Sequence, residues 1–104
     1  MTNETPKQVR KLRFGRCELC QRKTDLTFHH LIPRKVHRRK SFSKRFSRDE
    51  LHKGVNICRP CHRAIHKFHD ETHIAKHLDT LEKLKADEKI STYLVWIRKQ
   101  KIAD

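Results

Sequence analysis

Phe28-His29-His30-Leu31-Ile32-Pro33 is the stretch of this sequence around which the rest of the chain is arranged. It places two adjacent histidines in a short apolar run that is rich in β-branched and aromatic residues. Such a composition is typical of a β-strand, and the proline at its end would stop the strand. We therefore expect a strand over residues 26–32, flanked on each side by a Cys-x-x-Cys pair.

The four cysteines of the chain form those two pairs: Cys17, Cys20, Cys58 and Cys61. No apolar run is long enough to span a membrane, and the N-terminus lacks an apolar signal region, so we expect a cytoplasmic protein without membrane contact. In a reducing compartment, paired Cys-x-x-Cys units are metal ligands more often than disulfides, the alternative being redox-active or unligated thiols. Four thiolates suit tetrahedral Zn²⁺, and they would leave it no open position. We expect a structural zinc site.

The chain has 104 residues, of which 35% are hydrophobic and 37% charged. This length allows one small domain, whose thin core would need a metal or another staple to be stable. We expect residues 1–8 to be a disordered tail and residues 9–104 to form the domain. Within it, residues 17–67 would carry the metal sites, and residues 70–104 would be a helical extension.

The net charge of +14 is confined to one part of the chain. Residues 70–104 contain seven acidic and seven basic residues, so the whole excess lies in residues 1–69. This asymmetry predicts a polyanion-binding surface rather than a generic solubility charge. Nine basic and two acidic residues fall within 34–53. We read this segment as a long loop that holds a phosphate backbone, the alternative being a solvated insertion.

The basic residues expected to contact nucleic acid come from this segment and from the region of the second cysteine pair: Arg34, Lys35, Arg38, Arg39, Lys40, Lys44, Arg45, Arg59 and Arg63. Residues 9–16 are also basic, and they could form an arm along a nucleic-acid backbone or a solvated lead-in. Phe42 and Phe46 have i, i+4 spacing and could anchor a short helix within the loop.

Helices are expected after a second short strand at residues 55–57. Pro60 suits the first turn of a helix that runs to about residue 67. Asp70 would cap the next helix, which carries one apolar stripe: Ile74, Leu78, Leu81 and Leu84. Asp87 or Glu88 would begin the last helix, with an apolar face of Ile90, Tyr93, Leu94 and Ile97. We expect these two helices to pack on each other and to cover the zinc module.

Several histidines have spacings that suit a metal centre. His62 and His66 are i, i+4 on the helix expected at 60–67 and share one face. Imidazoles bind divalent transition metals and act as general bases near neutral pH. Because adjacent strand residues face opposite sides, His29 and His30 can serve one site only if the strand ends or bulges there. A further i, i+4, i+8 row is either a metal patch or a polar helix face: His69, His73 and His77.

Taken together, Cys-x-x-Cys, HHLIPR at residues 29–34 and NICRPCHRAIH at residues 56–66 resemble the HNH endonucleases. The match spans about residues 17–67. The resemblance implies an α+β protein with a small ββα-metal (His-Me finger) domain, stapled by the four-cysteine zinc site and followed by C-terminal helices. It also implies a bacterial or phage-encoded intracellular protein that acts on DNA.

The resemblance assigns a role to each matching residue. His30 would be the general base that activates water. A catalytic divalent cation, Mg²⁺ or another such as Mn²⁺, would be held by His29, His62 and His66. Asn56 matches the family asparagine that supports the base. In many members this asparagine stands earlier in the chain, at the position that Lys53 occupies here.

Our leading interpretation is a metal-dependent DNA endonuclease or nickase that hydrolyses phosphodiester bonds. The alternative is a non-catalytic zinc-containing module that binds DNA or RNA, which explains the cysteines and the charge but leaves the histidines without a role. A third interpretation, a zinc domain that binds other proteins, leaves the charge asymmetry unexplained as well.

Overall fold

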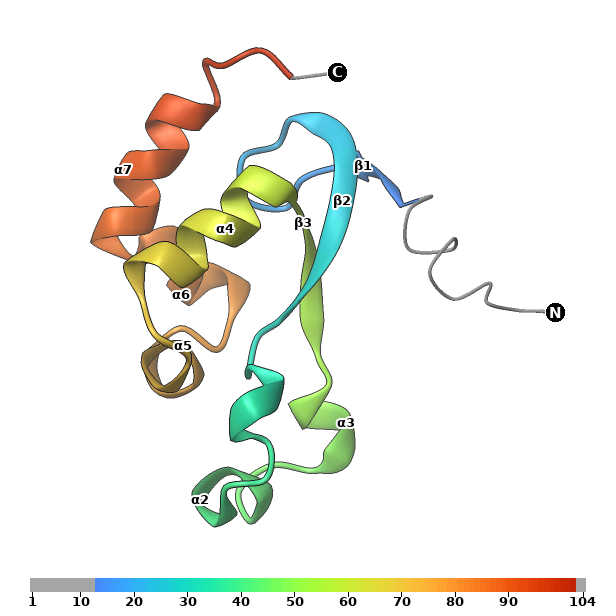
Figure 1. Ribbon diagram of the computed structural model, residues 1–104, viewed down its shortest axis with the longest axis vertical. Coiled ribbons are helices and arrows are strands. Elements are labelled where there is room, and N and C mark those ends of the chain that lie inside the picture. Colours follow the sequence, from blue (N-terminus) through green and yellow to red (C-terminus); the bar gives the residue numbers. More distant parts are fainter. Residues whose placement is uncertain (1–12, 103–104) are drawn as a thin grey trace, which may run out of the picture.

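The computed structural model describes residues 13–102, so the tail expected at residues 1–8 lies outside the described part of the chain. These residues form an α+β domain with a three-stranded antiparallel sheet in the order β1-β2-β3 (Figure 1). The strands are β1 (Phe14–Arg16), β2 (Lys23–His30) and β3 (Gly54–Cys58). The helices are η1 (Arg34–Val36), α2 (Lys40–Ser43), α3 (Arg48–Leu51), α4 (Arg59–Phe68), α5 (Glu71–His77), α6 (Leu81–Ala86) and α7 (Glu88–Ile97).

The sequence predicts the central strand at residues 26–32, whereas β2 spans Lys23–His30. It therefore begins three residues earlier and ends two residues earlier than expected. Residues 14–16 pair with residues 23–25 as β1, so they are a sheet strand and not a free arm. This pairing gives residues 23–25 a partner and extends β2 toward the N-terminus. At the other end, His30 pairs with Gly54, and the Leu31 N–H donates to the Lys53 carbonyl at 3.0 Å before the chain leaves the sheet.

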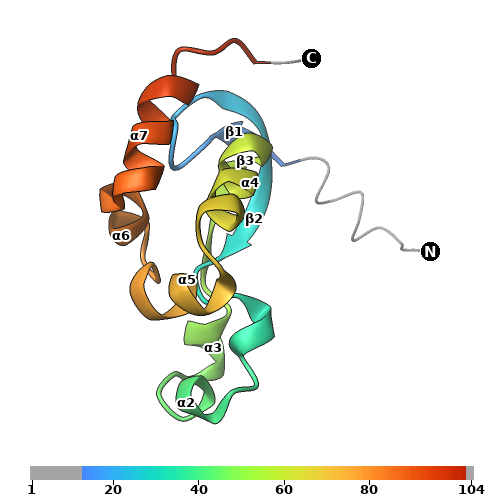
Figure 2. The ribbon, with the colours of Figure 1, turned by 60° about the vertical axis from the view of Figure 1, so that its left-hand side comes forward.

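Helix α4 follows β3 without a loop and lies against β2 and β3 (Figures 1 and 2). Cys58 is its N-cap and Pro60 lies in its first turn, as the sequence predicts. Its buried residues are Cys61, Ala64 and Ile65. The four cysteines belong to the main apolar core, together with Val55, Ile57, Ile65 and residues of the C-terminal helices.

The apolar stripe expected on one helix is divided between α5 and α6. Thr80 accepts a hydrogen bond from the Lys83 N–H at 3.0 Å and so caps a new helix. The stripe residues Ile74, Leu78 and Leu84 are nevertheless all buried in the same core. Asp70 and Asp87 cap α5 and α7 as predicted. Helix α7 packs against α6 and also against α4.

The basic segment 34–53 is folded rather than irregular. It forms η1, α2 and α3, and Ser47 and Glu50 make a reciprocal capping box at the start of α3. Its side chains Val36, Phe42 and Leu51 build a second, small core with Ile32, which precedes the segment, and Ala75 of α5, and Phe46 packs against this core. In Figure 1 this segment lies at the end of the molecule opposite α7. Within residues 13–102, no helix combines the length and the apolar character needed to cross a membrane.

Candidate functional site

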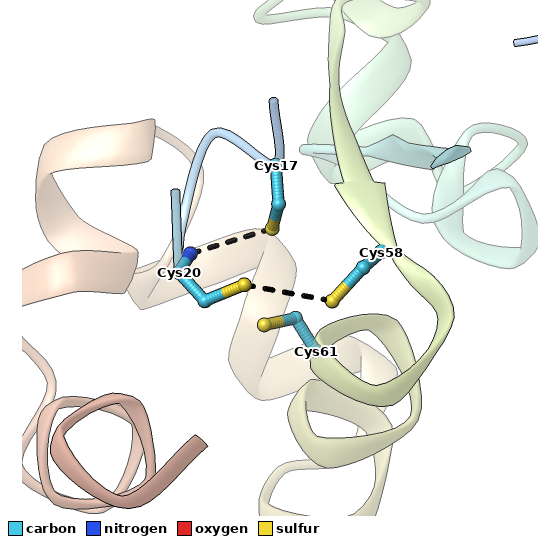
Figure 3. Close-up of side chains that lie close together, drawn as sticks. All are labelled: Cys17, Cys20, Cys58 and Cys61. Carbon is cyan, nitrogen blue, oxygen red and sulfur yellow. Dashed lines mark hydrogen bonds between the residues drawn. The ribbon is translucent and has the colours of Figure 1, made fainter. Parts of the chain in front are cut away.

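The four cysteines converge on one point (Figure 3). Cys17 and Cys20 come from the turn between β1 and β2, whereas Cys58 ends β3 and Cys61 lies in the first turn of α4. All four sulfurs lie within 4.8 Å of one another, and no cysteine is more than 1% exposed. The predicted convergence is confirmed. The cluster can hold a metal ion and is compatible with structural zinc.

Hydrogen bonds to sulfur shape this thiol cluster. The Cys20 N–H donates to Cys17 Sγ at 3.3 Å, and Gln21 adopts φ 69°, which closes the turn. Arg22 donates from Nε to Cys20 Sγ at 3.3 Å and from Nη2 to Cys58 Sγ at 3.7 Å. Its guanidinium would offset part of the negative charge of the thiolates. Sequence reasoning missed Arg22, although a cation two residues after a Cys-x-x-Cys pair was the signal that could have found it.

Hydrogen bonds among Cys17, Cys58 and Cys61 shift the pKa values of these thiols in opposite directions. Hydrogen bonding to Cys58 and Cys61 lowers the pKa of Cys17, and the same interaction raises the pKa of Cys58 to about 11. The pKa of Cys61 is also raised, chiefly by hydrogen bonding to Cys17. The Cys17 thiolate is therefore stabilised at the expense of those of Cys58 and Cys61, and a divalent cation would stabilise all of these thiolates together.

A second cluster joins β2 to α4 through three histidines. The ring nitrogens of His29, His62 and His66 offer ligand atoms within 4.8 Å of one another. The ring centroids are 5.2 Å apart for His29–His62, 5.4 Å for His29–His66 and 5.2 Å for His62–His66. The structure thus brings together the three histidines that the sequence suggested as ligands of one cation.

His29 is the most unusual side chain of this histidine cluster. It is 1% exposed, and among residues 13–102 neither Nδ1 nor Nε2 finds a hydrogen-bond partner. Buried polar atoms in native proteins almost always have a hydrogen-bond partner, so we expect these two nitrogens to bind a group such as a metal ion or a water molecule. Burial, followed by the charges of His62, His66 and His30, lowers the pKa of His29 to about 3. The ring is therefore neutral near pH 7 and keeps a lone pair for a metal.

Thr27 fixes the orientation of His62. The Thr27 hydroxyl donates to the Ile57 carbonyl at 3.0 Å and lies 2.8 Å from His62 Nδ1. Because the single hydroxyl proton is used on Ile57, the hydrogen bond to His62 must be donated by its Nδ1–H. The lone pair of His62 is then on Nε2, the form in which an imidazole binds a metal. Thr27 precedes His29 by two residues, so its place on the same strand face was predictable.

We expect Thr27→Val to weaken binding of Mn²⁺ to the histidine cluster by about 10- to 100-fold, as for other supports of metal ligands. Valine has nearly the same shape, so the fold should persist while His62 loses its orientation. Titration calorimetry of the zinc-loaded protein measures the effect. Thr24→Val is the matched control, because within residues 13–102 the Thr24 hydroxyl makes no hydrogen bond to the protein. Equal affinities for the two variants would contradict this role.

His30 has different neighbours from His29, as the alternation along β2 requires. Its ring lies 5.7 Å from that of His37, 5.8 Å from His52 and 5.0 Å from Phe28, centroid to centroid. Burial, followed by the charges of His37, His52 and Arg34, lowers its pKa. His37 and His52 both belong to the basic segment 34–53, where the sequence suggests at most a contact with phosphate, and no local spacing links them to His30.

Asn56 is bound to side chains near the sheet and not to His30. Its Oδ1 accepts a hydrogen bond from Arg13 at 2.6 Å, and its N–H donates to Glu18 Oε2 at 2.7 Å. Among residues 13–102, no hydrogen bond joins Asn56 to His30. Lys53 stands at the position where many members of the HNH family have the asparagine. Its carbonyl accepts a hydrogen bond from the N–H of Leu31, the residue after His30.

A groove of about 1100 Å³ runs along β2 and past the start of α4. His30 and Phe28 line it, together with five basic residues and one acidic residue, Asp25. The basic residues are Arg13, Arg22, Arg59, Arg63 and Lys101. The structure thus adds three cations to the predicted Arg59 and Arg63. Arg13 lies in the basic stretch 9–16 that the sequence suggested as a possible arm, whereas Arg22 and Lys101 were missed because they come from distant parts of the chain.

The basic residues predicted in segment 34–53 do not form one uniform surface. Arg39 donates to Thr72 Oγ1 at 2.9 Å, and Lys35 Nζ lies 3.6 Å from Glu71 Oε1, so both are tied to α5. Arg45 lies over the ring of Phe46, 5.2 Å from its centroid. Exposed side chains are found at all the predicted positions of the segment: Arg34, Lys35, Arg38, Arg39, Lys40, Lys44 and Arg45.

Comparison with known proteins adds one relative. No family model matches the chain, and no solved structure does. The uncharacterized protein YisB of Bacillus subtilis (strain 168) is 31% identical to it over 87 residues, which cover 83% of this chain and 76% of YisB. Identity over most of both chains establishes a common family, so this protein belongs to the family of YisB.

Proposed function

We propose that this protein is a metal-dependent DNA endonuclease or nickase of the HNH type, with a ββα-metal core made of β2, β3 and α4. The observation that carries the proposal is His29, a buried imidazole grouped with two further imidazoles on α4, whose two nitrogens have no hydrogen-bond partner in the described part of the chain. A purely structural histidine would be expected to have a hydrogen-bond partner. The proposal gives both the histidine cluster and the positive charge a purpose.

Two metal ions are proposed, with different tasks. The thiol cluster would hold structural zinc, because four thiolates close the coordination sphere. The histidine cluster would hold a divalent cation through three imidazoles, which leaves positions for water and substrate. Imidazole ligands favour Mn²⁺ and later transition metals over Mg²⁺, which prefers oxygen. When bound, such a cation supplies positive charge to the phosphate and its leaving oxygen.

His30 is proposed as the general base. Its lowered pKa keeps the ring neutral near pH 7, so it can accept the proton of an attacking water. Because His29 and His30 face opposite sides of β2, the scissile phosphate would have to lie across the end of the strand. His30 is the last residue of β2, where the strand no longer separates its two faces.

The substrate surface is proposed to combine the groove beside β2 with the exposed cations of segment 34–53. Both present guanidinium and ammonium groups, which neutralise phosphates without reading base sequence. Segment 34–53 alone carries nine basic and two acidic residues. We therefore expect recognition that is led by the backbone and shape of DNA. A non-catalytic zinc module would share this surface but would need no metal at His29.

The proposal is tested by plasmid nicking. Zinc-loaded protein should convert supercoiled plasmid to nicked circles with Mn²⁺ or Mg²⁺, and a chelator at a concentration that spares the thiol-bound zinc should stop it. His29→Ala should reduce the rate by at least about a hundredfold, since it removes a central metal ligand. His77→Ala is the control, because His77 lies outside the histidine cluster. Absence of nicking by the unchanged protein would favour the non-catalytic binding module, and equal nicking by His29→Ala and the unchanged protein would overturn the catalytic role of the histidine cluster.

A further inference from the structure

A third group of potential metal ligands lies among the C-terminal helices, apart from the thiol and histidine clusters. Its members are His69, His73 and Asp87. His69 follows the last residue of α4, His73 lies on α5 and Asp87 caps α7. Each offers one ligand atom, and these atoms lie within 4.8 Å of one another. In sequence, the row His69–His73–His77 suggested one helix face, but the helix break at Asp70 separates His69 from the other two.

His69 and Asp87 are already held in place by the fold. His69 Nε2 lies 2.9 Å from Asp87 Oδ2, and both side chains are largely buried, at 11% and 15% exposed. The same oxygen accepts the Ile90 N–H at 3.1 Å as the cap of α7. Burial acts to raise the pKa of Asp87, but the hydrogen bonds from His69 and from the backbone of α7 outweigh it and lower the pKa. The carboxylate is therefore ionised near pH 7.

Donor atoms remain for a further partner. The Asp87 carboxylate takes hydrogen bonds from His69 and the Ile90 N–H on Oδ2 and a further one from the Lys89 backbone, which leaves part of the roughly four lone-pair sites of its two oxygens. The His73 ring makes no hydrogen bond to the protein in the same range, and it stacks on His69 with centroids 4.6 Å apart and planes 13° from parallel. Two imidazoles and one carboxylate are a donor set that late first-row metals favour.

We propose that His69, His73 and Asp87 form a transition-metal site for an ion of the Zn²⁺, Co²⁺ or Ni²⁺ class. Three protein ligands leave at least one position for water. The ion would link the end of α4 to α5 and to the start of α7, three elements that are otherwise joined by apolar packing and by the His69–Asp87 contact. The site does not depend on nuclease activity, and metal binding there should stabilise the folded state.

The test uses Co²⁺ alone as the probe and full-length protein whose thiol cluster is filled with zinc. The double variant His62→Ala/His66→Ala provides the background, since it removes two ligands of the histidine cluster. In this background we expect about one equivalent of Co²⁺ to bind and to broaden the amide resonances of α5 and of the start of α7. At a hundredfold excess over the dissociation constant, the melting temperature should rise by about 10 °C.

Two added substitutions assign the ligands. His73→Ala should weaken Co²⁺ binding by at least about tenfold, and so should Asp87→Asn, which keeps a side chain able to cap α7. His77→Ala is the matched control one turn further along α5, and it should leave the affinity within about twofold. Absence of Co²⁺ binding in the background variant would overturn the proposal. So would equal losses for His73→Ala and His77→Ala.

Discussion

Replacing Cys58 with serine is expected to release the metal of the thiol cluster and to unfold the protein. Cys58 is fully buried, ends β3 and caps α4, so it joins the sheet to the helix. Structural zinc in small domains contributes an apparent binding free energy of about 10–16 kcal/mol, which equals or exceeds the roughly 5–15 kcal/mol stability of an ordinary domain. The loss should appear as absent zinc, a disordered circular dichroism spectrum and no cooperative melting.

Ala64→Ser is the control for this substitution. Ala64 is 7% exposed and lies on α4, so the change also places a hydroxyl at a buried position of the same helix. A serine there can bond to a backbone carbonyl of the preceding turn, so the cost should be small. We expect this variant to keep its zinc and a cooperative transition. A folded, zinc-free Cys58→Ser protein would contradict a structural role for the thiol cluster.

Replacing His30 with alanine is expected to abolish nicking while DNA binding survives. General bases contribute about 10²- to 10⁴-fold to a rate, so the nicking rate should fall by that factor. Binding should change little, because the proposed phosphate contacts come from arginines and lysines of the groove and of segment 34–53. Single-turnover nicking with Mn²⁺ measures the rate, and fluorescence anisotropy of a labelled duplex measures the affinity.

If the histidine cluster binds Mn²⁺ as proposed, His30→Ala should leave that binding intact, because His30 is not one of the three histidines of the cluster. This separates it from His29→Ala, which should lose both Mn²⁺ affinity and nicking. His77→Ala serves again as a control for removal of a histidine elsewhere. If His30→Ala nicks as fast as the unchanged protein, the base must be another group, and the assignment of His30 fails even if the protein is a nuclease.

The parts of the site that were predictable from sequence are those governed by local spacing. Each Cys-x-x-Cys pair places two thiols close together by its local spacing. The thiol cluster then requires only that the fold bring the two pairs into contact. His62 and His66 share a helix face by their i, i+4 spacing, and Pro60 marks the first turn of that helix. Local geometry also separates His29 from His30, because successive side chains of a strand point to opposite faces of the sheet.

The parts that were not predictable depend on partners far away in the chain. Residues 23–25 become part of β2 because β1 pairs with them. Local composition placed the start of the strand later, since it does not reveal this pairing. Thr80 divides the apolar stripe into two helices while the buried positions stay the same, so a pattern of apolar spacing could not reveal the break. Asp87 approaches His69 only after α5 and α6 reverse the chain.

The contact between the Leu31 N–H and the Lys53 carbonyl has a consequence for how this family can diverge. The chain departs from the sheet and returns to it at one point, and most of the small second core lies in the excursion between them. Its length and composition can therefore change without moving Cys58 or His29. Relatives could therefore differ in this excursion, and so in the charge of the surface that it forms, while the thiol cluster and the histidine cluster remain unchanged.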